Sequence, residues 1–137
     1  MESIALKPVT AEIASLFALG SEPMPVEVAG DVAGPVRTRR EELVQVLLNL
    51  LDNARQAGAT SVRLVLADYT LRLEDNGTGI PADQLGRIFE PSFSTNTSGT
   101  GLGLAIVRRL VEGWEATIAV ESRPGSGAAF TIRFSPG

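Results

Sequence analysis

Leu71–Pro81 reads LRLEDNGTGIP, and the rest of the chain is organised around this stretch. It begins with the alternation of a strand, reaches Glu74 and Asp75, and breaks at Asn76-Gly77-Thr78-Gly79. Glycines let a backbone approach a ligand closely, and a carboxylate accepts hydrogen bonds from planar groups. The stretch therefore predicts a recognition site for a planar hydrogen-bonding ligand, centred on Asp75.

The residues before this stretch predict a hairpin and, ahead of it, a long helix. Ser61–Ala67 and Tyr69–Glu74 alternate apolar and polar side chains with Asp68 as the turn, so the hairpin delivers Asp75 to a strand end. From about Arg39 to Ala57, apolar residues recur at steps of three and four, and Gly58 is placed to stop this helix.

Polar side chains form a narrow stripe along the long helix. At about 100° per residue, the stripe beside the apolar face contains Glu42, Asn49, Asn53 and Gln56. Asparagine is unfavourable within a helix because its side chain competes for backbone hydrogen bonds. Two interpretations stay open: a helix edge solvated by water, or amide oxygens that hold a hard cation such as magnesium together with substrate phosphates.

The outer parts of the chain predict further helices and strands. Strands are expected at Ser3–Lys7 and Val26–Val28, and a closing hairpin at Ala116–Val120 and Ala128–Phe134. Helical segments are expected from Pro8 to Gly20, as a short start at Pro81–Leu85, and as a well-buried third helix at Gly103–Glu112. Three helices with paired strands between them predict an α+β two-layer sandwich.

The composition describes one globular domain. The 137 residues are 44% apolar and 20% charged, which excludes a disordered polar chain. The formal charge of −4 makes nucleic acid an unexpected partner. No cysteine or histidine occurs, which excludes disulfides and imidazole acid–base chemistry. No segment approaches the ~20 apolar residues that span a bilayer, so a cytoplasmic chain without membrane contact is expected.

A second glycine cluster, Gly99-Thr100-Gly101-Leu102-Gly103, directly precedes the third expected helix. Free N–H groups and the positive end of the helix dipole favour an anion there, usually phosphate; the alternative is a flexible glycine linker. A Walker-type loop is excluded, because the G-x-x-x-x-G-K-[ST] string is absent and Lys7 is the only lysine. Gly77–Ala82 matches G-x-G-x-x-[GA] but follows a hairpin strand, so we interpret the match as accidental.

Four segments resemble, in order, the N, G1, F and G2 boxes of the catalytic ATP-binding domain of sensor histidine kinases. They are Asn49–Ala54 (NLLDNA), Asp75–Pro81 (DNGTGIP), Ile88–Phe93 (IFEPSF) and Gly99–Leu104 (GTGLGL). The chain is similar to this branch of the GHKL, or Bergerat-fold, ATPases over about residues 39–112. The resemblance implies a two-layer α/β sandwich in which three helices cover one face of a mixed, mostly antiparallel sheet, with an ATP lid.

The resemblance also implies roles for individual residues. Asp75 would accept from the adenine amino group, and Asn53, with Asn49 beside it, would hold magnesium near the phosphates. The other nucleotide-binding residues that it implies are Gln56, Gly77, Gly79, Ile80, Phe89, Phe93, Thr100, Gly101, Leu102, Gly103 and Leu104. The implied cofactors are ATP or ADP and Mg. No catalytic residue is assigned; Glu42 lies on the stripe, but a carboxylate at a helix start favours the dipole in any case.

The implied reaction positions the γ-phosphate of ATP for transfer to a histidine on a separate dimerisation domain. The resemblance implies that residues 1–137 form the catalytic domain alone, excised or free-standing, with the acceptor domain absent from them. That domain and, indirectly, a response regulator are the expected partners. Two alternatives stay open: a kinase or ATPase of the same fold with another acceptor such as serine, and a nucleotide-binding module without transfer activity.

Three positions depart from the pattern of the family. Asn96 stands near a usual lysine, Glu115 near a usual glycine and Ala128 near a usual threonine. Loss of the lysine removes a charge-assisted phosphate contact of about 1.5–3 kcal/mol, so weaker nucleotide binding is expected. Glu115, next to Trp114, is expected to perturb the turn after the third helix.

Overall fold

The computed structural model describes residues 1–19, 23–90, 103–123 and 125–137. The helices are α1 (Leu6–Ala18), α2 (Arg40–Gln56) and α3 (Gly103–Gly113). The strands are β1 (Glu2–Ile4), β2 (Val26–Val32), β3 (Val36–Thr38), β4 (Val62–Asp68), β5 (Thr70–Asp75), β6 (Thr117–Arg123), β7 (Gly127–Arg133) and β8 (Ser135–Pro136). No helix within these ranges has the length and apolar character needed to cross a membrane.

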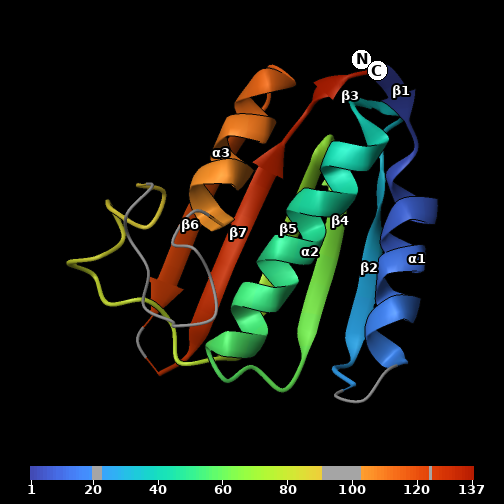
Figure 1. Ribbon diagram of the computed structural model, residues 1–137. Coiled ribbons are helices and arrows are strands. Elements are labelled where there is room, and N and C mark those ends of the chain that lie inside the picture. The colour runs from blue at the N-terminus through green and yellow to red at the C-terminus, as the bar shows by residue number, and fades with distance from the viewer. Residues whose placement is uncertain (20–22, 91–102, 124) are drawn as a thin grey trace.

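The five longer strands form one layer and the three helices the other, with every helix on the same face of the sheet (Figure 1). The strand order is β2-β4-β5-β7-β6; β2 and β4 are parallel, and the other neighbours are antiparallel. This confirms the predicted sandwich with a mixed, mostly antiparallel sheet. The hairpin of β4 and β5 is also confirmed, with Asp68 in its turn at φ 49°.

Alternation along the strands places the core between the two layers. Apolar side chains at every second position are buried toward the helices: Val62, Leu64 and Leu66 in β4, Leu71 and Leu73 in β5, and Phe130 and Ile132 in β7. The apolar face of α2 packs onto them and is buried along its whole length. Because Asp75 follows Leu71 and Leu73 in this alternation, its side chain starts on the helix side of the sheet.

A small second sheet brings the two ends of the chain together. Its order is β1-β3-β8, and Gly137 N–H donates to the Pro35 carbonyl (2.8 Å) beside it. Figure 1 shows both termini next to this sheet, at the end of the molecule where α2 begins. The sequence did not predict β3, since three residues are too few for a periodic pattern to appear.

Three predicted elements differ from the structure. Pro81–Leu85 forms a turn closed by the bond from Gln84 N–H to the Pro81 carbonyl (2.9 Å) and not a helix. A second turn follows across Gly86, from Arg87 N–H to the Gln84 carbonyl (2.9 Å), and glycine is unfavourable within a helix. The strand expected at 3–7 ends at Ile4, since α1 already begins at Leu6. The third helix is less buried than predicted: only Val107 and Val111 are fully covered, because one stripe of α3 faces the sheet.

The turn after α3 is a Schellman motif with Glu115 in the left-handed conformation. Ala116 N–H donates to the Val111 carbonyl (3.2 Å) and Glu115 N–H to the Glu112 carbonyl (3.0 Å), with φ 61° at Glu115. The expected perturbation is therefore absent from the hydrogen bonds of the turn. What the glutamate adds is the strain of a side chain at positive φ.

Glu115→Gly is expected to raise the free energy of unfolding by about 1 kcal/mol, because glycine adopts this φ without strain. Chemical denaturation of both proteins measures the change. The end of α2 supplies the matched control, since Gly58 has φ 84° and a side chain there would meet nothing within 4 Å. Gly58→Glu should cost a similar amount; a neutral Glu115→Gly would show that the turn stores no strain.

Candidate functional site

Asp75 lies at the last position of β5, paired with Val62 of β4. Its Oδ1 accepts from the N–H of Gly77 (2.8 Å) and from the N–H of Ala128 at the start of β7 (3.3 Å). Both recorded hydrogen bonds meet this one oxygen, so within the described residues Oδ2 has no hydrogen-bond partner. The half-buried carboxylate is thus held in place by one oxygen and offers the other as an acceptor.

The loop after Asp75 is fastened to the end of α2 and to the start of β4. Asn76 Oδ1 accepts from the N–H groups of Thr60 (2.8 Å) and Ser61 (3.1 Å), and Thr78 N–H donates to the Ala57 carbonyl (3.0 Å). Gly77 is buried here, and a Cβ on it would lie 2.8 Å from the same carbonyl. Glycine at this position therefore serves close backbone packing.

The β6–β7 hairpin fastens the same loop from the other side. Gly125 N–H donates to the Thr78 carbonyl (2.7 Å), and Ile80 N–H donates to Ser122 Oγ (2.5 Å). Gly127, at φ 98°, lies so close that a Cβ would stand 2.0 Å from the Asp75 carbonyl oxygen. The loop from Asp75 to Ile80 is thus bonded to α2, β4 and the hairpin, which fixes it without a ligand.

The polar side chains of the stripe on α2 have different surroundings in the structure. Asn49 and Asn53 are half-buried, and neither side-chain amide bonds to any residue that the structure describes, so their carbonyl oxygens are available to a ligand. Gln56 is exposed, and its amide donates to Asp52 on the same helix (3.0 Å). Glu42 Oε1 accepts from the indole N–H of buried Trp114 (2.8 Å), which gives this carboxylate a structural use.

The remaining site residues lie toward α3. Phe89 is half-buried, packs edge-to-face on Phe130 (6.3 Å between ring centroids), and has the Arg108 guanidinium 5.9 Å from its ring centroid. Gly103 begins α3, and Leu104 is half-buried against the core. Four of the predicted residues, Phe93, Thr100, Gly101 and Leu102, lie outside the described part of the chain, as does Asn96.

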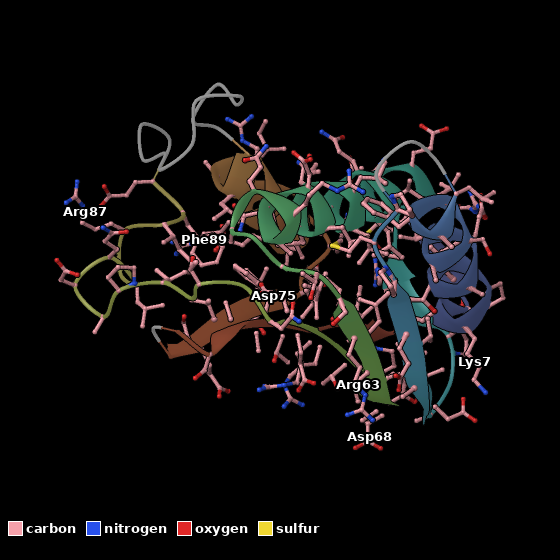
Figure 2. All side chains as sticks on the ribbon, turned by 90° about the horizontal axis from the view of Figure 1, so that it is seen from below. Lys7, Arg63, Asp68, Asp75, Arg87 and Phe89 are labelled. Atoms are coloured by element: carbon pink, nitrogen blue, oxygen red, sulfur yellow. The ribbon has the colours of Figure 1, made fainter. Side chains whose placement is uncertain are left out.

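Lysine takes no part in the site. Figure 2 shows Lys7 on the far side of the molecule from Phe89, and its ammonium pairs with Asp31 (3.4 Å). Because Lys7 is the only lysine in the sequence, negative charge on a ligand would have to be met by N–H groups, arginine or a bound cation.

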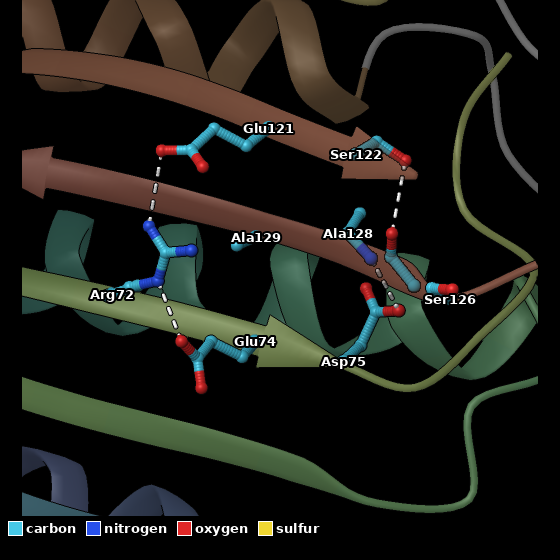
Figure 3. A pocket seen from close by; sticks show the side chains of 9 residues that line it. Arg72, Glu74, Asp75, Glu121, Ser122, Ser126, Ala128 and Ala129 are labelled. Carbon is cyan, nitrogen blue, oxygen red and sulfur yellow. Dashed lines mark hydrogen bonds and ion pairs between the residues drawn. The ribbon is translucent and has the colours of Figure 1, made fainter. Parts of the chain in front are cut away.

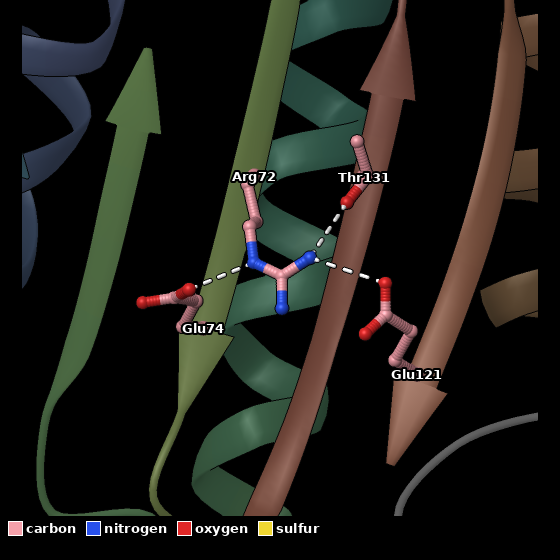
Figure 4. Close-up of polar contacts among 4 residues, drawn as sticks. All are labelled: Arg72, Glu74, Glu121 and Thr131. Carbon is pink, nitrogen blue, oxygen red and sulfur yellow. Dashed lines mark hydrogen bonds and ion pairs between the residues drawn. The ribbon is translucent and has the colours of Figure 1, made fainter. Parts of the chain in front are cut away.

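A hollow of about 480 Å³ opens on the other face of the sheet, where Arg72 and Glu74 line it, and it extends to Asp75 at the strand end (Figure 3). Arg72 joins three strands through Glu74 (2.7 Å), Thr131 (3.3 Å) and Glu121 (3.4 Å) (Figure 4). The hydrogen bond with Glu74 is the main cause that raises the pKa of Arg72; burial opposes the rise and Glu121 adds to it. These charges satisfy one another, so they stabilise the open sheet face.

Sequence reasoning gave no site role to Ser122, which bonds to the loop at Ile80, or to Ala128, which bonds to Asp75. Ala128 acts through its backbone N–H, which no side-chain pattern marks. Ser122 is one hydroxyl in a polar strand end, and its only signal is the turn Pro124-Gly125-Ser126-Gly127 that follows.

Comparison with known proteins agrees with this geometry. The profile of the family described as histidine kinase-, DNA gyrase B-, and HSP90-like ATPase matches residues 38–137. The signal transduction histidine-protein kinase AtoS of Escherichia coli (strain K12) is 43% identical over 105 residues, which cover 72% of this chain and 17% of AtoS. The sensor histidine kinase ZraS of the same strain is 44% identical over 110 residues, 76% of this chain and 24% of ZraS.

Solved structures resemble the whole fold. The nucleotide-free catalytic domain of the histidine kinase ThkA has a TM-score of 0.78 at 28% identity, covering 98% of this chain and 96% of that domain. Full-length ShkA in complex with AMPPNP has a TM-score of 0.75 at 28% identity, covering 99% of this chain and 31% of ShkA. The chain therefore corresponds to one domain of the longer proteins that it resembles.

Proposed function

This chain belongs to the family of histidine kinase-, DNA gyrase B- and HSP90-like ATPases, and on that premise we propose that it is the Mg-ATP-binding catalytic domain of a sensor histidine kinase. Its relatives AtoS and ZraS are described as a signal transduction histidine-protein kinase and a sensor histidine kinase. The chain spans 17% and 24% of their lengths, and the proposal assigns sensing and the phosphate acceptor to segments other than this domain.

The observation that carries the proposal is that the two carboxylate oxygens of Asp75 have different surroundings. One oxygen accepts from Gly77 and Ala128, and the other is left for a ligand donor. The exocyclic amino group of adenine is such a donor, whereas guanine presents a carbonyl at the same place, which a carboxylate repels. A carboxylate oriented before the ligand arrives loses little freedom on binding, which favours affinity and base selection together.

The residues of α2 fit a magnesium ion. Asn49 and Asn53 are one helical turn apart, and their amide oxygens are hard ligands with no partner among the described residues. A bound magnesium would neutralise charge on the phosphates. In this proposal Asn53 and Asn49 orient the ion, while Gly77, Gly79, Ile80 and Phe89 border the base, and Gly103 and Leu104, together with the predicted residues 93 and 100–102, approach the phosphates.

The acceptor is proposed to be a histidine supplied in trans. The chain contains no histidine, so its contribution is to position the nucleotide and to neutralise charge, which is most of what phosphoryl transfer requires. A dimerisation domain that bears the histidine is the proposed direct partner, and a response regulator is the indirect one.

Incubation with γ-labelled ATP, Mg and a matching dimerisation domain tests the transfer. We expect label on the acceptor domain that is lost in acid and retained in base, as for phosphohistidine. The same domain with its histidine replaced by alanine is the control and should stay unlabelled. An acid-stable product would indicate a serine acceptor, and binding of ATP without label on any histidine partner would indicate a module without transfer activity; either outcome contradicts the proposal.

A further inference from the structure

Ser122 lies near the end of β6, where the β6–β7 hairpin contacts the loop from Asp75 to Ile80. Its Oγ accepts from Ile80 N–H (2.5 Å) and donates to the Gly127 carbonyl (3.1 Å), and the side chain is half-buried. A hydroxyl can accept and donate through one atom in a small space, so Ser122 joins the loop to the hairpin beside the link that Asp75 Oδ1 makes between Gly77 and Ala128. Figure 3 shows the hydroxyl beside the hairpin, near Asp75 and Ala128.

The link continues through one peptide group to the carboxylate. The Gly127 carbonyl and the Ala128 N–H belong to the same planar peptide unit, with the two groups on opposite edges. Ser122 binds the carbonyl edge, and Asp75 Oδ1 accepts from the N–H edge (3.3 Å). Because the unit is rigid, the hydroxyl that orients the carbonyl also aims the N–H at Asp75.

We propose that Ser122 is a positioning residue for base recognition: through Ile80 and the 127–128 peptide, its hydroxyl sets the loop and the Asp75 carboxylate that select adenine. This proposal rests on the proposed nucleotide-binding function. Ser122 does not contact the ligand in this proposal. It acts on the loop at Ile80 and on the Asp75 carboxylate at the same time. Its loss therefore weakens the preference for adenine over guanine as well as the stability of the fold.

Titration calorimetry with ADP and with GDP tests the proposal on Ser122→Ala. We expect ADP affinity to fall about tenfold, the worth of one well-placed hydrogen bond, with GDP affinity nearly unchanged, so the preference for ADP falls by the same factor. Ser122→Thr keeps a hydroxyl and should restore ADP binding to within about twofold. A role in stability alone leaves the ratio of the two affinities unchanged, because both titrations see the same folded protein.

Ser135→Ala is the matched control. Its Oγ likewise donates to a backbone carbonyl, that of Glu115 (3.0 Å), at the far end of the sheet. It should change neither affinity. If Ser122→Ala binds ADP and selects it over GDP as the unaltered chain does, the positioning role is wrong.

Two further outcomes, no ADP binding by the unaltered chain and a Ser122→Ala variant that does not fold, are interpreted separately. An unaltered chain that does not bind ADP overturns the nucleotide-binding function itself. If Ser122→Ala does not fold, hydrogen exchange in the unaltered chain decides: the Ile80 amide is expected to be protected without nucleotide, and exchange at the rate of a free loop amide overturns the proposal.

Discussion

Asp75→Asn is expected to lower the affinity for ADP by about a hundredfold or more, because the site is left with an unpaired donor whichever way the amide turns. With its NH₂ at the place of Oδ2, asparagine meets the adenine amino group donor to donor. With the NH₂ at the place of Oδ1, it meets the N–H groups of Gly77 and Ala128, which the carboxylate accepts at 2.8 and 3.3 Å. Calorimetry at fixed Mg concentration measures the loss.

Asp83→Asn is the control for this substitution. Asp83 is an exposed carboxylate in the turns that follow the loop, so its neutralisation changes the net charge equally without touching the site. ADP affinity should stay within about twofold. A folded Asp75→Asn protein with undiminished ADP affinity would exclude Asp75 as the adenine acceptor.

Asn53→Ala is expected to weaken Mg-dependent nucleotide binding by about thirtyfold, or about 2 kcal/mol, because it removes one oxygen from the cation. The same change should raise the free energy of unfolding by about 0.5 kcal/mol, since alanine is the better helix former. The opposite signs arise because the side chain of Asn53 is half-buried on α2 and its amide bonds to no described residue, so the amide adds little to the fold. Titrations with and without EDTA, and denaturation, measure the two effects.

Gln45→Ala controls for the loss of an amide from α2. Gln45 is exposed near the start of the same helix, two turns before Asn53 and toward the end away from Asp75, so nucleotide binding should be unchanged. If Asn53→Ala lost affinity equally in Mg and in EDTA, the asparagine would contact the nucleotide directly and the cation assignment would be wrong.

The centre of the site could be predicted from the sequence because periodicity fixes which way side chains face. Leu71 and Leu73 alternate into the core, so Asp75 follows on the same side at the strand end, as its pairing with Val62 confirms. The three-and-four spacing of α2 likewise placed Asn49 and Asn53 at the border of the apolar face, where both are half-buried. Local patterns were enough for these residues.

What periodicity cannot give is which distant backbone group meets a given side chain. Ile80 and Ser122 are 42 positions apart, and their bond depends on two registers: that of β5 on β7, where Glu74 pairs with Ala129, and that of β6 on β7. Nothing in any one strand alone specifies these registers, since they follow from packing of the whole sheet. In the small sheet, β3 and β8 were not predicted for another reason: strands of three and two residues are too short to show a period.

The departures at Glu115 and Ala128 have different consequences. Glu115 keeps the hydrogen bonds of its turn and adds strain at a distance from Asp75. Ala128 reaches Asp75 through its N–H, so the contact is available to any residue except proline. Neither position therefore removes the recognition geometry of the carboxylate.

Titration of the unaltered chain with ADP and with GDP, each in Mg and in EDTA, tests the central claim most directly. The different surroundings of the two Asp75 carboxylate oxygens and the free amides of Asn49 and Asn53 predict one ADP per chain, stronger binding in Mg than in EDTA, and much weaker binding of GDP. Equal affinity for the two bases, or no binding of ADP in Mg, would contradict an adenine site built on Asp75.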